Sequence, residues 1–354
     1  MFVFASFLPI GMATTAAFGA SSMAYATLAL LAVGVPLLDT VLPRRKPEPL
    51  SGSGHGLSKT LGVAHLLLLP LGIYALGGNT GLTQGAQVAL FVSILMIFGQ
   101  ISNSNAHELI HLGGGAGRFL GRLVYASLLF GHHATAHPAV HHRYVATPRD
   151  PNSARRGEGL YRFLLRAWTG SFREGLRVEN HRLKLIGRPA WHWSHPYWGY
   201  GLMSLVTLCV SGIIGGWTGV FTHAALALGA TMQLLTSDYV QHYGLARQKD
   251  ASGRYEPVAP DHSWNAPDGF SRRMMLNAPL HSEHHLHPTI PYHALSAPIG
   301  PVLPYSLPIM AGIAMIPPVW HTVMKRELAT LASSRPLKPM PRSKSRRSNL
   351  DNVA

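Results

Sequence analysis

Histidine is the residue type in this chain best suited to chemistry, with 21 copies among 354 residues. Eight of them fall in three clusters, HELIH, HPAVHH and HSEHH, and a ninth, His242, lies in the segment DYVQHYG. The clustered residues are His107, His111, His137, His141, His142, His281, His284 and His285. Spacings of three or four residues place side chains on one helical face. Each cluster can therefore present two or three imidazoles in one direction.

Convergent imidazoles at this spacing indicate metal binding. Imidazole suits iron, copper, zinc and nickel, so the residue type does not name the metal. Eight or nine nitrogens exceed what one ion can bind, and this indicates two metals. No set of Asp and Glu ligands clusters with the histidines. The site would therefore differ from the carboxylate-bridged diiron centres of four-helix bundles.

Long apolar segments predict that the clusters belong to a membrane protein. Residues 1–43 contain no Lys or Arg and one acid, Asp39, and a break at residues 19–22 divides them into a helical hairpin. No basic residue precedes Phe2, so we expect no cleavable signal peptide. With the further spans, about six are predicted. The further spans lie at about 61–77, 87–103, 196–217 and 219–240.

Basic residues beside the spans predict the orientation of the chain. Arg44, Arg45 and Lys46 directly follow the second span. By the positive-inside rule this loop, and both ends of a six-span chain, lie in the cytoplasm. The histidine clusters are at the same ends of the spans. We therefore expect an all-α integral membrane protein with a cytoplasmic histidine-rich site.

Charge and cysteine content exclude several classes of protein. The formal net charge is +15, but the Lys and Arg residues lie in loops beside apolar spans without a nucleic-acid motif. Orientation and attraction to anionic headgroups explain that charge. Cys209 is the only cysteine, which excludes disulfides, Cys-ligated zinc and Fe–S clusters held by this chain alone. We assign residues 1–320 to one membrane-embedded domain and residues 321–354 to a basic, disordered tail.

At the histidine clusters the sequence resembles the integral-membrane alkane 1-monooxygenase family, within the membrane fatty acid desaturase and hydroxylase superfamily. Members share HELxH, an EHxxxHH-type cluster, an NYxEHYG segment and an HSDHH-type cluster. The stretches ATPRDPNSARRGE, GRYEPVAPDHSWN and HPT also match the family. The resemblance extends over about residues 60–300.

The resemblance implies an oxidoreductase that hydroxylates an unactivated C–H bond, at the terminal methyl of an alkane or similar apolar chain. It implies two iron ions, O2, electrons from a rubredoxin-like donor, and a lipid environment in a bacterial inner membrane. No catalytic residue beyond the iron ligands is expected. The implied ligands are His107, His111, His137, His141, His142, His242, His281, His284 and His285.

Two glutamates of the family pattern are absent. Ala136 stands before the second cluster and Gln241 stands in the HYG segment where the family has Glu. A ligating imidazole normally donates its other N–H to a carboxylate or carbonyl, and loss of that partner typically costs about 10 to 100-fold in affinity or activity. The carboxylates that could compensate are Glu108, Asp150, Asp238 and Glu283.

Three alternatives remain open from the residues. A fatty acyl or lipid desaturase or hydroxylase uses similar clusters and would differ in its product. A membrane zinc protease would use only HELIH, with Glu108 as the general base. A metal transporter should carry its ionisable groups within the spans rather than at their ends.

The other histidines are left out of the ligand set. His132 and His133 precede the second cluster and are candidate partners of its ligands. His287 and His293 follow the third cluster and are left undecided. The rest are expected at the surface or the membrane interface: His55, His65, His181, His192, His195, His223, His262 and His321.

Overall fold

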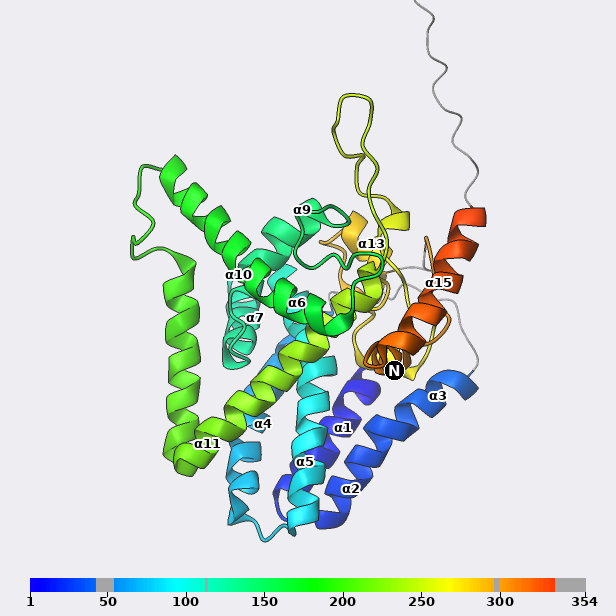
Figure 1. The fold of residues 1–354 in the computed structure, drawn as a ribbon. Helices are drawn as coiled ribbons and strands as arrows, with labels where there is room; N and C mark the ends of the chain where they lie inside the picture. The colour runs from blue at the N-terminus through cyan, green and yellow to red at the C-terminus, as the bar shows by residue number, and fades with distance from the viewer. Residues whose placement is uncertain (43–53, 112–113, 296–298, 335–354) are drawn as a thin grey trace, which may run out of the picture.

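Helices account for the regular structure of this protein (Figure 1). The computed structural model describes residues 1–42, 54–111, 114–295 and 299–334. Within these ranges there is no strand, only the isolated bridges Lys249–Tyr255 and Asn265–Val302. The expected all-α fold is confirmed for the described residues. The basic residues 44–46 and the chain from 335 onward lie outside them.

The N-terminal residues form the predicted helical hairpin. Its first arm is α1, and its second arm runs through α2, a π turn η1 and α3. Buried alanines such as Ala13, Ala16 and Ala24 occupy the contact between the arms and their neighbours. Small side chains let helices approach closely within a membrane. The bounds are α1 Phe2–Ala17, α2 Ser21–Ala29, η1 Leu30–Gly34 and α3 Val35–Val41.

A second pair of helices follows and ends at the first histidine cluster. The rising arm is α4 (His55–Tyr74), extended by a π turn, η2 (Ala75–Asn79). The returning arm is a continuous stretch of 28 residues from Gln84 to His111. Its length and composition suit a membrane span, and its last turns carry HELIH. It comprises α5 Gln84–Ile97, the π turn η3 Phe98–Ser102 and α6 Asn103–His111.

The helix α11 (Pro196–His242) contains both of the last two predicted spans. Its backbone is non-helical at Gly215 and at Gly216, where φ is +56°. Glycine adopts such a φ without the steric cost of a side chain. In Figure 1 the first segment of α11 runs along one side of the molecule, and the second crosses the bundle. His242 ends the second segment.

Within the described residues, four helical stretches are long and apolar enough to cross a membrane: 21–41, 55–79, 84–111 and 196–242. The helix α1 is apolar but has only 16 residues. Because α11 bends at two glycines, these stretches and α1 correspond to the six predicted segments. The count of six spans itself stays a prediction.

The remaining elements gather at the end of the bundle where α6 and α11 finish (Figure 1). Trp264 and Trp320 are fully buried among them, and the Trp320 ring lies 5.2 Å from that of Tyr239. The elements are α7 Gly115–Ser127, α8 His133–Ala136, η4 His137–His141, α9 His142–Tyr144, α10 Leu160–Leu185, η5 Pro260–His262, α12 Phe270–Met274, α13 His281–Leu286, η6 Tyr292–Ala294, α14 Leu307–Ala314 and α15 Pro317–Ser334.

The predicted start of a disordered tail at residue 321 is wrong. Helix α15 continues to Ser334, because Met324 is buried against the same core as Trp320. The basic run that suggested disorder begins only at residue 335.

Asp39 joins the N-terminal hairpin to the far end of the chain. One of its carboxylate oxygens accepts a hydrogen bond from the backbone N–H of Ser271, at 2.9 Å, in the first turn of α12. A carboxylate at a helix N-terminus satisfies free N–H groups. The only acid of the first 43 residues therefore holds the hairpin against the segment that precedes the third histidine cluster.

A first prediction concerns the bend of α11. A Cβ atom at Gly219 would lie 2.2 Å from the backbone oxygen of Ser211, which a side-chain rotation cannot relieve. We expect Gly219→Ala to lower the free energy of unfolding by about 1–3 kcal/mol. Thermal unfolding in detergent measures the change. The control is Gly199→Ala in the same helix, where a Cβ meets nothing within 4 Å; equal stability of the two variants would contradict the prediction.

Candidate metal centre

The nine candidate ligands converge at one end of the bundle in two groups. Within each group every member offers one ligand atom, and these atoms all lie within 4.8 Å of one another. The first group contains His107, His111, His137, His142 and His284. The second contains His141, His242, His281 and His285. These are the nine residues predicted from the sequence, and the structure brings all of them together.

A π turn positions the second cluster. The five-residue spacing between His137 and His142 would point their side chains in different directions on an α-helix. Residues 137–141 form the π turn η4, whose wider turn brings residues i and i+5 close together. The Nε2 atoms of His137 and His142 are 2.9 Å apart as a result. His141 is directed to the second group instead.

The third cluster also divides between the two groups. On the short helix α13, His281 and His285 are one turn apart, with their Nε2 atoms separated by 3.1 Å. His284 lies on another side of the helix, and its Nε2 is 3.1 Å from that of His142. His242, at the end of α11, completes the second group with its Nε2 3.0 Å from that of His281. The α13 and η4–α9 segments therefore each supply both groups.

A loop carboxylate supports one of these imidazoles. His141 donates through Nδ1 to Asp150, at 2.8 Å, and both side chains are buried. Asp150 is itself held by the backbone N–H of Asn152 and the hydroxyl of Ser153. Asn152 also donates to Asp238 of α11, at 2.6 Å. The loop after the second cluster thus fixes His141 and the end of α11 together.

Electrostatics keep most of these imidazoles neutral. Burial, and then repulsion from neighbouring imidazoles, holds the pKa values of His137, His142 and His284 well below the usual histidine value. The pKa values of His281 and His285 are lowered for the same reasons. Burial also disfavours the charged form of His141, but the carboxylate of Asp150 outweighs it and raises the pKa of His141. Neutral imidazole is the form that binds metal.

The donor geometry fits metal ions. The Nε2 atoms of His107, His111 and His141 are buried and have no hydrogen-bond partner. Elsewhere Nε2 atoms face one another at 2.9–3.1 Å. A metal–imidazole bond of about 2.1 Å gives nitrogens at right angles a separation of about 3.0 Å. The lone pairs of these Nε2 atoms would otherwise repel one another. Their spacing is the one expected for ligands that surround a cation.

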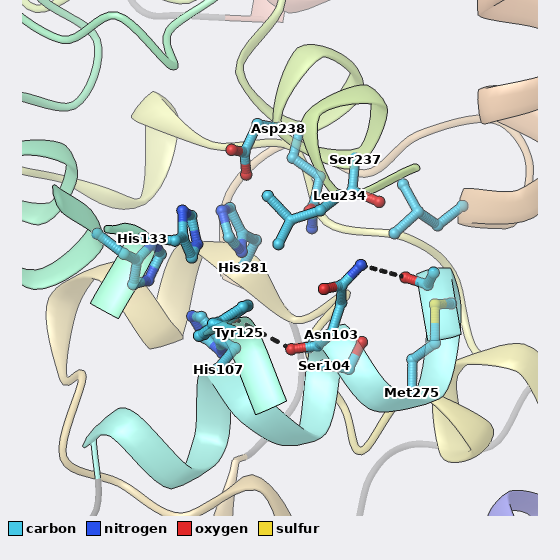
Figure 2. A pocket seen from close by; sticks show the side chains of 15 residues that line it. Asn103, Ser104, His107, Tyr125, His133, Leu234, Ser237, Asp238, Met275 and His281 are labelled. Carbon is cyan, nitrogen blue, oxygen red and sulfur yellow. Dashed lines mark hydrogen bonds between the residues drawn. The ribbon is translucent and has the colours of Figure 1, made fainter. Parts of the chain in front are cut away.

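A cavity opens beside the two groups (Figure 2). Figure 2 shows His107, His133 and His281 gathered at one end of it, with Met275 toward the other. Leu234, Ala278 and Leu307 add apolar lining. The polar lining residues are Asn103, Ser104, Ser237, Asp238 and Gln241. An apolar group in this cavity would lie against the imidazoles.

The positions that depart from the family pattern lie close to the site. Ala136 is buried directly before His137, and Gln241 lines the cavity with its side-chain Nε2 buried and unpartnered. Of the four carboxylates considered as substitutes, Asp150 bonds a candidate ligand. Glu108 instead accepts from the backbone of Tyr292, at 3.2 Å.

Several histidines expected near the surface are buried. His65 and His223 join a polar network within the bundle: His65 bonds Ser102 and Ser127, and His223 bonds the Ser127 backbone oxygen. His195 and His262 are also buried. His133 packs 5.0 Å from His137, ring to ring, as expected for a neighbour of the ligands. Sequence spacing could not reveal the network, because each of its members is isolated along the chain.

Comparison with known proteins agrees with this geometry. The fatty acid desaturase family model matches residues 85–298. Alkane 1-monooxygenase 2 of Pseudomonas aeruginosa is 31% identical over 303 residues, covering 82% of this chain and 80% of the relative. An alkane 1-monooxygenase of Pseudomonas putida is 35% identical over 249 residues, covering 70% and 61%. The xylene/toluene monooxygenase hydroxylase component XylM of Pseudomonas putida is 26% identical, covering 82% and 78%.

A helical membrane protein with a buried, histidine-rich centre for iron is an oxidoreductase of the desaturase type. With about a third of its residues identical to such relatives over most of its length, the chain belongs to the alkane 1-monooxygenases within that family. It is therefore a monooxygenase of the membrane, and its two groups of histidines could hold the iron of such an enzyme.

The position of His242 generates a second prediction. His242→Ala removes one of four imidazoles in the second group and leaves the first group intact. We expect the iron content to fall, because loss of even an outer partner of a ligand typically costs about 10 to 100-fold in metal affinity, and loss of a ligand itself removes more. Elemental analysis of purified protein measures it. His181→Ala, at an exposed histidine of α10, is the control; unchanged iron in the His242 variant would argue against this assignment.

Proposed function

We propose that this chain is a diiron monooxygenase that hydroxylates the terminal methyl of an alkane or similar apolar chain, with electrons from a rubredoxin-like donor. The observation that carries the proposal is the division of nine buried or half-buried imidazoles into groups of five and four. We assign all nine as iron ligands: His107, His111, His137, His141, His142, His242, His281, His284 and His285.

The ligand numbers favour two irons over one zinc. Structural zinc sites are usually tetrahedral, and catalytic zinc sites usually use three protein ligands. Five imidazoles in one group exceed both numbers. A zinc protease built on HELIH would also leave the other seven histidines without a role. Their burial would then be costly, because polar groups at this depth are expensive without partners.

The cavity favours an apolar substrate. An alkane has no polar group to bind, so its affinity must come from burial, at about 0.8 kcal/mol per methylene. Leu234, Met275 and Leu307 supply apolar walls beside His107 and His281. In this proposal these side chains aim one terminal carbon at the iron centre and keep water from it. Bound iron would supply the redox chemistry of O2.

The stoichiometry requires an external donor. Hydroxylation consumes the substrate C–H bond, one O2, two electrons and two protons, and it yields one alcohol and one water. The sequence contains no flavin or nicotinamide fingerprint, and one cysteine cannot ligate an Fe–S cluster alone. A separate carrier must therefore deliver the electrons, and the basic loops of the chain favour an acidic one.

The same proposal places the site at the cytoplasmic face of a bacterial inner membrane. Six membrane segments, with α11 counted as two, bring the ends of α6 and α11 to one side. The basic residues 44–46 and those of α10 favour the cytoplasm for that side. We treat residues from the N-terminus through α15 as one membrane-embedded domain.

A third prediction tests the reaction. Purified protein should contain close to two irons, and with 18O2, reductant and an alkane it should form a primary alcohol that carries 18O. Gas chromatography with mass spectrometry identifies the product. An alkene without added oxygen would establish desaturase chemistry instead, and one zinc with peptidase activity would establish the protease alternative.

A fourth prediction follows from Gln241. A carboxylate at this position is a stronger acceptor for an imidazole N–H than an amide, and it pushes electron density onto the metal. We expect Gln241→Glu to lower the iron reduction potential and to raise iron affinity by up to about tenfold. Spectroelectrochemical titration and competition with a chelator measure these changes. Gln248→Glu places the same charge at an exposed site as a control. If both variants behave like the native protein, the carboxylate at 241 has no such role.

A further inference from the structure

Two arginines and a tyrosine form a stack on the surface beside the iron centre. The guanidinium carbons of Arg143 and Arg149 lie 5.3 Å and 5.1 Å from the centroid of the Tyr144 ring. Both arginines are exposed. Cations at such distances from an aromatic face are attracted to it, so the stack is a preformed surface feature.

The stack is linked to both imidazole groups. Arg143 directly follows His142, a half-buried member of the first group. Arg149 directly precedes Asp150, which accepts a hydrogen bond from His141 of the second group. A single peptide bond therefore separates each arginine from a residue that ligates or orients a ligand.

A protruding hairpin extends this surface. The segment after α11 rises beyond α9 and α13 in Figure 1. At its base Arg247 donates from its backbone N–H to the oxygen of Ala146, at 2.9 Å, and from its side chain to the oxygen of Arg143, at 3.3 Å. Farther along, Lys249 lies 5.0 Å from the centroid of the Tyr255 ring. We call Arg143, Tyr144, Arg149, Arg247 and Tyr255 the arginine–tyrosine patch.

The cations of the patch remain available to a partner. The ion pairs of the described residues include neither Arg143 nor Arg149. The acids of the hairpin are engaged locally: Asp250 bonds Ser252 and Arg254, and Glu256 bonds Gln248 and His262. Arginine and tyrosine are enriched in protein interfaces, where they combine charge with apolar contact.

We infer that the arginine–tyrosine patch is the docking surface for an acidic one-electron carrier protein. This inference rests on the proposed function, because it is hydroxylation that demands two electrons from outside the chain. Carboxylates of the carrier would pair with the arginines, and the tyrosines would pack against its apolar rim. The carrier would then sit beside the segments that supply and orient ligands of both groups.

The test compares two double variants in iron-loaded protein in lipid nanodiscs, with an acidic rubredoxin as the probe. Arg143→Gln with Arg149→Gln removes two charges from the patch. Arg162→Gln with Arg173→Gln removes two charges from exposed positions on α10. Biolayer interferometry at low and high salt measures rubredoxin affinity. Iron content and melting temperature show whether each variant is intact.

We expect the patch variant to bind rubredoxin about tenfold more weakly at low salt and to lose most of the salt dependence, because rim charges act mainly through long-range attraction. The α10 variant should stay within about twofold of the native protein. Native affinity in the patch variant, or equal weakening in both, overturns the inference. Product formation with dithionite tests the hydroxylase proposal separately, because it needs no rubredoxin, and binding is measured without turnover.

Discussion

The structure depends on one electrostatic constraint: nine buried or half-buried imidazoles hold their nitrogen atoms close together in two groups. Two unprotonated imidazole nitrogens about 3 Å apart repel each other through their lone pairs unless a proton or a cation lies between them. Burial and mutual repulsion oppose protonation at His137, His284 and His285, which leaves metal ions as the stabilising partners. The long helices, the loop at Asp150 and the core around Trp320 all serve to hold these donors in place against that repulsion.

The two imidazole groups share their supporting segments, and this makes the centre a single unit. The η4–α9 segment supplies His137 and His142 to one group and His141 to the other. Helix α13 divides its histidines in the same way. A shift of either segment would therefore disturb both imidazole groups at once. Asn152 extends this coupling to α11, since its loop binds His141 through Asp150 and its own amide binds Asp238.

The helical class, the N-terminal hairpin and the approximate position of the bend in α11 could be predicted from the sequence, because the length of an apolar segment is a local property. The nine histidines could be picked out because most of them are closely spaced along the chain. It failed where tertiary contacts decide. His65 and His223 are isolated along the chain, so only the fold shows that they share Ser127. Residues 321–334 look polar enough for a tail, but burial of Met324 orders them as helix. The ligand roles and the two-iron stoichiometry remain predictions.

The π turn η4 bears on how such a motif can arise. On an ordinary α-helix, five residues turn the side chain through about 500°, so His142 would point about 140° away from His137. In the segment HPAVHH, His137 and His142 can therefore face the same group only where the helix is locally wider. Deleting one residue between the two histidines would instead give the i, i+4 spacing that a regular helix places on one face. The five-residue spacing and the π turn therefore depend on each other, and a change in the length of this segment requires a change in the turn.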